Sequence, residues 1–138
     1  EQDLVNSKVF FVVETLEYLQ KGGRIGLVAS LFGNALNLKP VISCNEEGVY
    51  YTVTKVRGRK QSITRVMDLA LKFAEGHKRI NVAVCHGGAP EEVKAVEAAI
   101  KEQLPDHEVF VSGQISPVLG VHTGPGLIGI GIEILSED

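Results

Sequence analysis

The sequence predicts an α/β fold, a mixed β-sheet with helices packed mainly on one face. From residue 61 onward the apolar pattern runs helix, strand, helix, strand, strand. That order suits a mixed sheet whose parallel pairs are joined by right-handed crossovers. Apolar residues make up 44% and charged residues 22% of the chain, a composition typical of globular domains. The length of 138 residues fits one domain, which we assign to residues 1–138.

The N-terminal part of the chain predicts two helices. Apolar residues recur every three or four positions over residues 9–19, behind Ser7 as a capping residue. Gly22 and Gly23 follow and end that helix. Residues 27–36 then suit a second, short helix.

A β-hairpin follows. Residues 38–44 read as a strand, and Pro40 within it indicates either an edge strand or the start of a strand. Residues 45–48, NEEG, form a turn, and residues 49–56 are a β-branched and aromatic strand. The basic stretch KVRGRK, residues 55–60, is expected on a loop, where it faces solvent or meets an acidic partner or a phosphate.

The second half alternates helices with strands. We expect a helix over 61–74, a strand over 79–85, a helix over 90–103, and strands over 107–113 and 127–135. A proline and two glutamates open the second of these helices, where they suit its first turn.

Composition and spacing exclude several classes of protein. A net charge of −3 argues against nonspecific nucleic-acid binding. No apolar run approaches the ~18 residues of a membrane span, so no transmembrane segment or signal peptide is predicted. Cys44 and Cys85 have no metal-ligand spacing and read as reduced thiols of a cytoplasmic protein. No catalytic motif appears, so we expect neither enzyme activity nor a metal or cofactor.

The stretch HTGPG, residues 122–126, carries the first candidate binding residue. His122 precedes a Gly-Pro-Gly corner, where a ligand can approach the backbone closely. The imidazole is able to donate a hydrogen bond to an anion at the edge of the core. The competing interpretation is a turn histidine paired with a carbonyl group.

Two further glycine-containing stretches carry candidates. Arg24 lies in KGGRIG, where its guanidinium either points into solvent or grips a carboxylate, a phosphate or protein backbone. His86 lies in CHGGAPEE, which lacks the full spacing of a phosphate-binding loop. We therefore interpret His86 as part of a plain strand-to-helix turn.

Residues 25–42 form an unusually apolar stretch. Core packing explains it, and so does a tunnel for an alkyl chain. Burial of ~15 methylenes contributes on the order of 10 kcal/mol, of which association entropy removes a large part. A carboxylate at the mouth of such a tunnel needs hydrogen-bond donors, because its desolvation would otherwise cancel the gain.

Several motifs together resemble the C-terminal half of DegV-family proteins. They are LEYLQKGGRIG, LFGNALNLKPVI, KVRGRK and HTGPGLIGIGI, and their order and spacing match over nearly all of the chain. The resemblance implies the C-terminal domain of the fold shared by DegV proteins and dihydroxyacetone kinases. It also implies a bacterial, cytoplasmic fatty-acid carrier. Such a carrier presents the carboxylate to a fatty-acid kinase, which makes an acyl phosphate for phospholipid synthesis.

The resemblance also implies site residues. The acyl chain lies in this domain, and its headgroup lies in a cleft toward an N-terminal domain whose Thr and Ser bind the carboxylate. That domain is absent from these residues, and the chain opens without Met. The implied headgroup residues are His122, Arg24, Thr123 and Gly124. The implied acyl-pocket residues are Leu27, Val28, Leu31, Phe32, Leu36 and Ile42. The implied kinase-docking residues are Arg57 and Arg59.

Two alternatives to a lipid carrier stay open. One is a docking module that binds a kinase or second domain and no lipid alone, because half a cleft cannot enclose a carboxylate. The other is an enzyme related to dihydroxyacetone kinases, which the lack of a nucleotide motif disfavours. Exposure of a partly apolar cleft surface also predicts self-association of the isolated chain.

Overall fold

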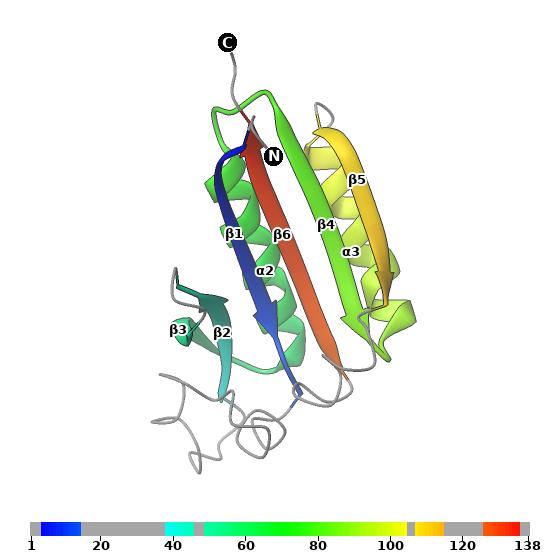
Figure 1. Cartoon of the computed structure of the whole chain (residues 1–138). Helices are drawn as coiled ribbons and strands as arrows, with labels where there is room; N and C mark the ends of the chain where they lie inside the picture. The colour runs from blue at the N-terminus through cyan, green and yellow to red at the C-terminus, as the bar shows by residue number, and fades with distance from the viewer. Residues whose placement is uncertain (1–3, 15–37, 46–48, 105–106, 115–125, 136–138) are drawn as a thin grey trace.

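A computed structural model describes residues 4–14, 38–45, 49–104, 107–114 and 126–135. These residues form one six-stranded sheet with two helices on one of its faces (Figure 1). The elements in chain order are β1 Leu4–Val12, β2 Leu38–Cys44, β3 Tyr50–Arg57, α2 Arg59–Ala74, β4 Ile80–Gly87, α3 Pro90–Gln103, β5 His107–Gln114 and β6 Leu127–Leu135.

The sheet has the strand order β3-β2-β1-β6-β4-β5. Every neighbouring pair is antiparallel except β4 and β5, which are parallel and connected through α3. Its two central strands, β1 and β6, come from opposite ends of the chain and pair along their whole length. The predicted mixed sheet with helices mainly on one face is therefore confirmed.

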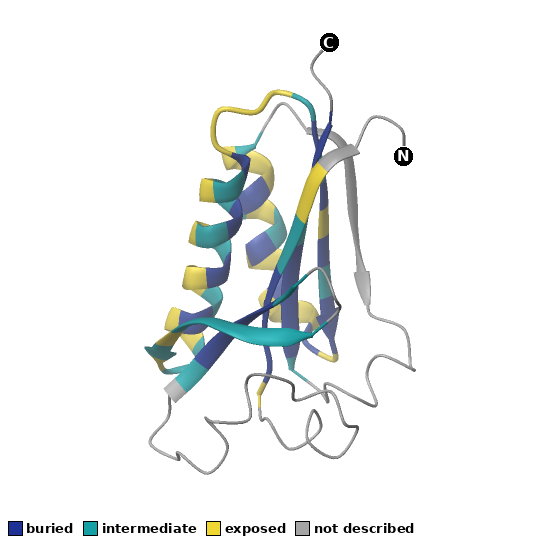
Figure 2. Cartoon of the chain, turned by 60° about the vertical axis from the view of Figure 1, so that its left-hand side comes forward, coloured by how far each residue is buried: buried dark blue, intermediate teal, exposed yellow. Residues whose placement is uncertain are grey.

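The main hydrophobic core lies between the sheet and the helices. The buried positions of α2 recur every fourth residue, at Ser62, Val66, Ala70 and Ala74, so one stripe of the helix faces the sheet (Figure 2). Isoleucines at alternate positions of β6 meet this stripe, since successive strand residues point to opposite faces. They are Ile128, Ile130, Ile132 and Ile134, all of them buried.

The predicted helix over residues 9–19 is wrong where the structure describes it. Residues 4–12 form β1, and Ser7, expected as a helix cap, is an exposed strand residue opposite Glu133. Phe10 and Val12 belong to the core under the helices, while Phe11 and Val13 are buried on the other face. A strand that is apolar on both faces has no period-two pattern, so its apolar spacing resembled that of a helix.

Two expectations around the hairpin are also corrected. KVRGRK is not a loop: its first three residues end β3, Gly58 makes the bend at φ 89°, and the last two begin α2. Glycine at residue 58 allows this abrupt change from strand to helix. Pro40 is near the start of β2, as one alternative predicted, but β2 lies inside the sheet between β3 and β1. β2 pairs with β1 at Ile42, beyond the proline, where Phe11 is its partner.

The other elements agree closely with expectation. β2 and β3 form the predicted hairpin, and β4, α3, β5 and β6 lie where the sequence placed them. Gly76 follows the end of α2 with φ 82°. The expected helix over 27–36, most of the turn over 45–48 and residues 115–125 lie outside the described residues.

Candidate functional site at one end of the sheet

Both segments that carry the predicted headgroup residues are attached at the same end of the sheet. Residues 15–37 lie between Glu14 and Leu38, and Lys39 Nζ donates a 3.0 Å hydrogen bond to the Glu14 carbonyl. Residues 115–125 lie between β5 and β6, and the Gly126 N–H donates to the carbonyl of Gly87 at the end of β4. The helices α2 and α3 begin at this end too (Figure 1).

A second, smaller apolar cluster lies on the face of the sheet that α2 and α3 do not cover. We call it the open-face cluster; its members are Phe11, Val13, Ile42 and Leu127, with Tyr50 and Cys85 packed against them. Its four buried members, Phe11, Val13, Ile42 and Leu127, are between 0 and 6% exposed. The rings of Phe11 and Tyr50 meet edge to face at a centroid distance of 5.4 Å, which links β1 to β3 across β2.

Gly129 allows the strands of this cluster to pack tightly. A Cβ atom at Gly129 would lie 3.1 Å from Phe11 Cβ and 3.2 Å from Cys85 Sγ. Any side chain there would push these two neighbours apart. At Gly131, further along the same strand, the nearest atom to an added Cβ is Ala83 Cβ at 4.0 Å. The tight packing therefore belongs to the end of the sheet where the two segments attach.

Cys85 is a free thiol at the border of the open-face cluster. Burial raises the pKa of the Cys85 thiol, and a hydrogen bond from the Gly129 backbone partly opposes that shift. Since the thiolate is the nucleophile, the raised pKa lowers the fraction of Cys85 that can react at neutral pH.

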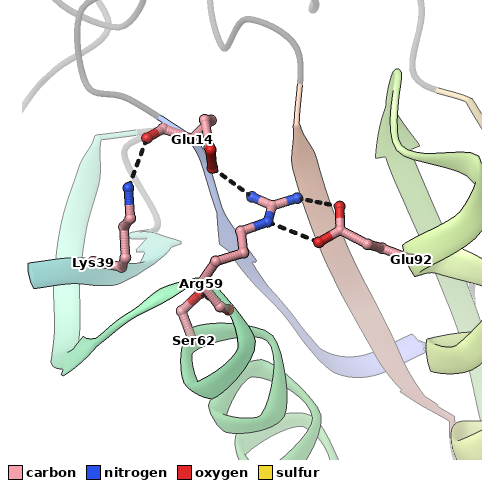
Figure 3. A network of polar contacts seen from close by, with 5 residues as sticks. All are labelled: Glu14, Lys39, Arg59, Ser62 and Glu92. Atoms are coloured by element: carbon pink, nitrogen blue, oxygen red, sulfur yellow. Dashed lines mark hydrogen bonds and ion pairs between the residues drawn. The ribbon is translucent and has the colours of Figure 1, made fainter. Parts of the chain in front are cut away.

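Arg59, the first residue of α2, joins three elements at the same end (Figure 3). Its Nε and Nη2 atoms donate to the two oxygens of Glu92, at 3.1 Å and 2.9 Å. Its Nη1 atom lies 3.5 Å from Glu14 Oε1. Arg59 therefore links the start of α2 to the first turn of α3 and to the end of β1. Its guanidinium holds the pKa of Glu92 below the usual range.

His86 fulfils the plain role that the sequence favoured. It is buried near the end of β4, and its Nδ1 atom accepts a 2.9 Å hydrogen bond from the Ala89 N–H. This bond closes the turn just before α3 begins. The interpretation of CHGGAPEE as a strand-to-helix turn is therefore confirmed.

The structure describes three of the residues predicted for binding. Ile42, from the acyl-pocket set, is a fully buried member of the open-face cluster. Arg57 is exposed at the end of β3, and Arg59 is partly buried between two carboxylates. The remaining predicted residues lie outside the described part of the chain: His122, Arg24, Thr123, Gly124, Leu27, Val28, Leu31, Phe32 and Leu36.

Sequence reasoning missed most residues that build this end of the sheet. The helix predicted over residues 9–19 includes Phe11 and Val13, so it did not predict that they are buried on the second face of the sheet. Glu14 and Glu92 read as ordinary acidic residues, because their common partner Arg59 is distant in sequence. A β-branched and aromatic run over residues 9–13 was the available signal for the strand.

Other kinds of site were considered among the described residues at both ends of the helices. A groove of about 600 Å³ lies at the far ends of α2 and α3, lined in part by Leu71, Ala74 and Leu104. Within the described ranges, no three His, Cys, Asp or Glu side chains are grouped closely enough to hold a metal ion. Neither of the two described helices is long and apolar enough to cross a bilayer.

The sequence is similar to several bacterial proteins. A DegV domain-containing protein of Clostridium acetobutylicum is 49% identical over 122 residues, which are 88% of this chain and 43% of that protein. One of Streptomyces coelicolor is 35% identical over 130 residues, covering 94% of this chain and 46% of that protein. The chain thus spans less than half the length of these curated relatives.

Solved structures share the fold. A DegV family protein from Thermus thermophilus, described as binding fatty acid, matches with a TM-score of 0.83 at 33% identity. The match covers 94% of this chain and 46% of that one. A stearic-acid-binding protein from Eubacterium ventriosum matches with a TM-score of 0.80 at 31% identity, over 96% and 46% of the two chains. A family model described as "Uncharacterised protein, DegV family" matches residues 4–135. Because that match covers nearly the whole sequence, this chain belongs to the DegV family.

Proposed function

We propose that this chain is the acyl-binding, C-terminal part of a cytoplasmic bacterial fatty-acid carrier that presents a fatty-acid carboxylate to a kinase. The observation that carries the proposal is the open-face cluster. Four apolar side chains are buried on the sheet face that the described helices leave uncovered, and they include the predicted pocket residue Ile42. The fatty-acid-binding descriptions of the solved relatives support the same ligand class.

The position of the cluster suits a ligand with an apolar tail and an anionic head. The cluster lies next to the chain ends that flank residues 15–37 and 115–125, which carry Arg24 and His122. The N-termini of α2 and α3 lie at this end as well, and the helix dipoles favour negative charge there. In the proposal, the tail lies against the open-face cluster, and Arg24, His122, Thr123 and Gly124 bind the carboxylate.

The proposed role is binding and presentation, with the phosphoryl transfer carried out by the kinase. Arg57 is the proposed docking residue, since it is exposed at the end of the edge strand β3. Replacing Arg57 with Ala is expected to lower kinase turnover and to leave fatty-acid affinity unchanged. Arg65→Ala, an exposed change on α2, is the control for a general loss of positive charge.

Two adjacent residues of β2 test the position of the acyl chain. Ile42 and Val41 are both fully buried, but Ile42 belongs to the open-face cluster and Val41 to the core under the helices. Ile42→Ala is expected to weaken oleate binding by about tenfold, because methylene contacts of ~0.8 kcal/mol each are lost. Val41→Ala is expected to lower stability and leave oleate affinity unchanged.

The experiment uses the whole protein that contains these 138 residues, delipidated and titrated with oleate under native mass spectrometry. A stoichiometric adduct supports the carrier, and equal affinities of the Ile42 and Val41 variants would remove the open-face cluster from the acyl site. If the whole protein forms no adduct but still binds a kinase, the docking-module alternative replaces the carrier. His122→Ala with unchanged affinity and unchanged kinase turnover would remove His122 from the headgroup site.

A further inference from the structure

The contacts of Arg59 differ from those of an ordinary surface ion pair. The guanidinium engages Glu92 with two hydrogen bonds in a planar, bidentate arrangement, which fixes its orientation. Its third nitrogen, Nη1, is buried, lies near Glu14 and makes no hydrogen bond with the described residues. Only 21% of the Arg59 side chain is exposed. Such a geometry holds backbone elements in place, whereas a solvent-facing arginine would be mobile.

Gly126 lies directly against this network. A Cβ atom at Gly126 would be 3.0 Å from Glu14 Cβ and 3.6 Å from Arg59 Nη1. The φ angle of Gly126 is 97°, so the backbone turns here in a way that side chains rarely allow. The N–H of Gly126 bonds to Gly87, two residues before the residue that caps α3. Arg59, Glu14 and the end of β4 therefore lie next to Gly126, the residue that precedes β6.

Arg59 and the three residues around it belong to segments far apart in sequence. Arg59 begins α2, Glu92 lies in the first turn of α3, Glu14 follows β1, and Gly126 precedes β6. Residues 15–37 start immediately after Glu14, and residues 115–125 end immediately before Gly126. Arg59 therefore lies beside the residues to which both segments are attached, Glu14 and Gly126.

We infer that Arg59 is a positioning residue, which sets the backbone at Glu14 and Gly126 through its contacts with Glu92 and Glu14. This inference rests on the proposed function, because the two positioned segments carry the proposed headgroup residues. It differs from the docking role that the resemblance implied for Arg59. Here the guanidinium acts inward, on carboxylates of the same chain.

The first test measures positioning without any ligand. Hydrogen exchange of the Gly126 amide is followed by NMR in the delipidated protein. Arg59→Met is expected to increase the exchange rate of this amide by about tenfold, equivalent to ~1.4 kcal/mol. The control Arg65→Met removes an exposed arginine of the same helix and should leave the rate unchanged. An unchanged Gly126 rate in Arg59→Met would overturn the inference, whatever the protein binds.

The second test separates positioning from simple attachment of α2 to α3. The exchange of charges in Arg59→Glu with Glu92→Arg can restore the pair between the helices, but it places two glutamates side by side at residues 14 and 59. We expect this double variant to recover thermal stability and to keep rapid Gly126 exchange and about tenfold weaker oleate binding. Recovery of exchange and affinity together with stability would show that Arg59 only ties the helices together. Failure of the unmodified protein to bind oleate would count against the proposed function and not against the exchange result.

Discussion

The two faces of the sheet bury apolar residues in different ways. The face under α2 and α3 carries a continuous core that runs along β1, β4 and β6. On the open face, the described residues form an apolar cluster near one end, and further along the face presents exposed residues such as Ser7, Ala83 and Glu133. The same strands thus serve a structural core on one side and a localised apolar site on the other.

This difference is visible within β6 alone. Its even-numbered positions are all isoleucines of the helix-covered core, while its odd-numbered positions carry Leu127, Gly129, Gly131, Glu133 and Leu135. Large uniform side chains are what a permanently packed interface needs, because gaps cost stability. On the open face, Gly129 lets Phe11 and Cys85 pack closely, whereas the nearest atom to a Cβ added at Gly131 is 4.0 Å away. The open face of β6 therefore lacks the uniform large side chains of the helix-covered core.

The largest effect is expected from the helix-covered face. Ile130→Ala removes a fully buried side chain from the centre of the core, and we expect a loss of about 4 kcal/mol in unfolding free energy. Urea denaturation measures it. Ile63→Ala, at a partly buried position of α2 beside the same core, should lose no more than about 1 kcal/mol. Equal losses would mean that the core is not centred on β6.

A pair of glycine substitutions sharpens the contrast along the open face. Gly129→Ala is expected to destabilise the protein by about 1–2 kcal/mol, since its Cβ would crowd Phe11 and Cys85. Gly131→Ala meets only ordinary contacts and should stabilise the strand by about 0.5 kcal/mol. The two thermal melts should thus move in opposite directions. Shifts of the same sign would remove the distinction between the two parts of the face.

The ion pair at the end of the helix layer is expected to contribute less. Glu92→Gln should cost about 0.5 kcal/mol, because Glu92 is 44% exposed and solvent screens its pair with Arg59. The lowered pKa means that this stabilisation is present above the ordinary glutamate pKa and is lost as the pH falls below it. Glu91→Gln, at a more exposed neighbouring position, is the control. A larger loss in the Glu91 variant would contradict the assignment.

The smallest effect on stability is expected from titration of the Cys85 thiol, and none is expected at neutral pH. Burial raises the thiol pKa, so its stabilising contribution is complete below the pKa of the unfolded thiol and is lost as the pH rises above it. In a Cys44→Ser background, alkylation of Cys85 by iodoacetamide at pH 8 should be at least about tenfold slower than that of a model thiol peptide. Equally fast alkylation would show that this part of the open-face cluster is open to water.

Sequence patterns predicted those elements whose two faces differ. The β-branched and aromatic residues of β3, the helical stripe of α2 and the turn residues around α3 located these elements within a few residues. The error at β1 arose because Phe10 to Val13 are apolar on both faces, so no period distinguished strand from helix. Placement of a central strand depends on its partners, β2 and β6, which a local window does not contain.

Only part of the candidate site could be predicted from the sequence. The resemblance to the DegV family implied Ile42 as a pocket residue, and it lies in the open-face cluster. The network of Arg59 was not predictable, since Glu14 and Glu92 lie 45 and 33 positions away and resemble any surface glutamate. Tertiary packing brings these charges together, and a local sequence pattern does not predict such contacts.

The pairing of β1 with β6 bears on how the protein is made in the cell. The edge of β1 that pairs with β6 stays open until β6 has been synthesised, although β2 can already pair with the other edge of β1. Native contacts between such distant residues also slow folding. A stop codon shortly before β6 would leave β1 and β4 with unpaired edges, and the shortened product should aggregate.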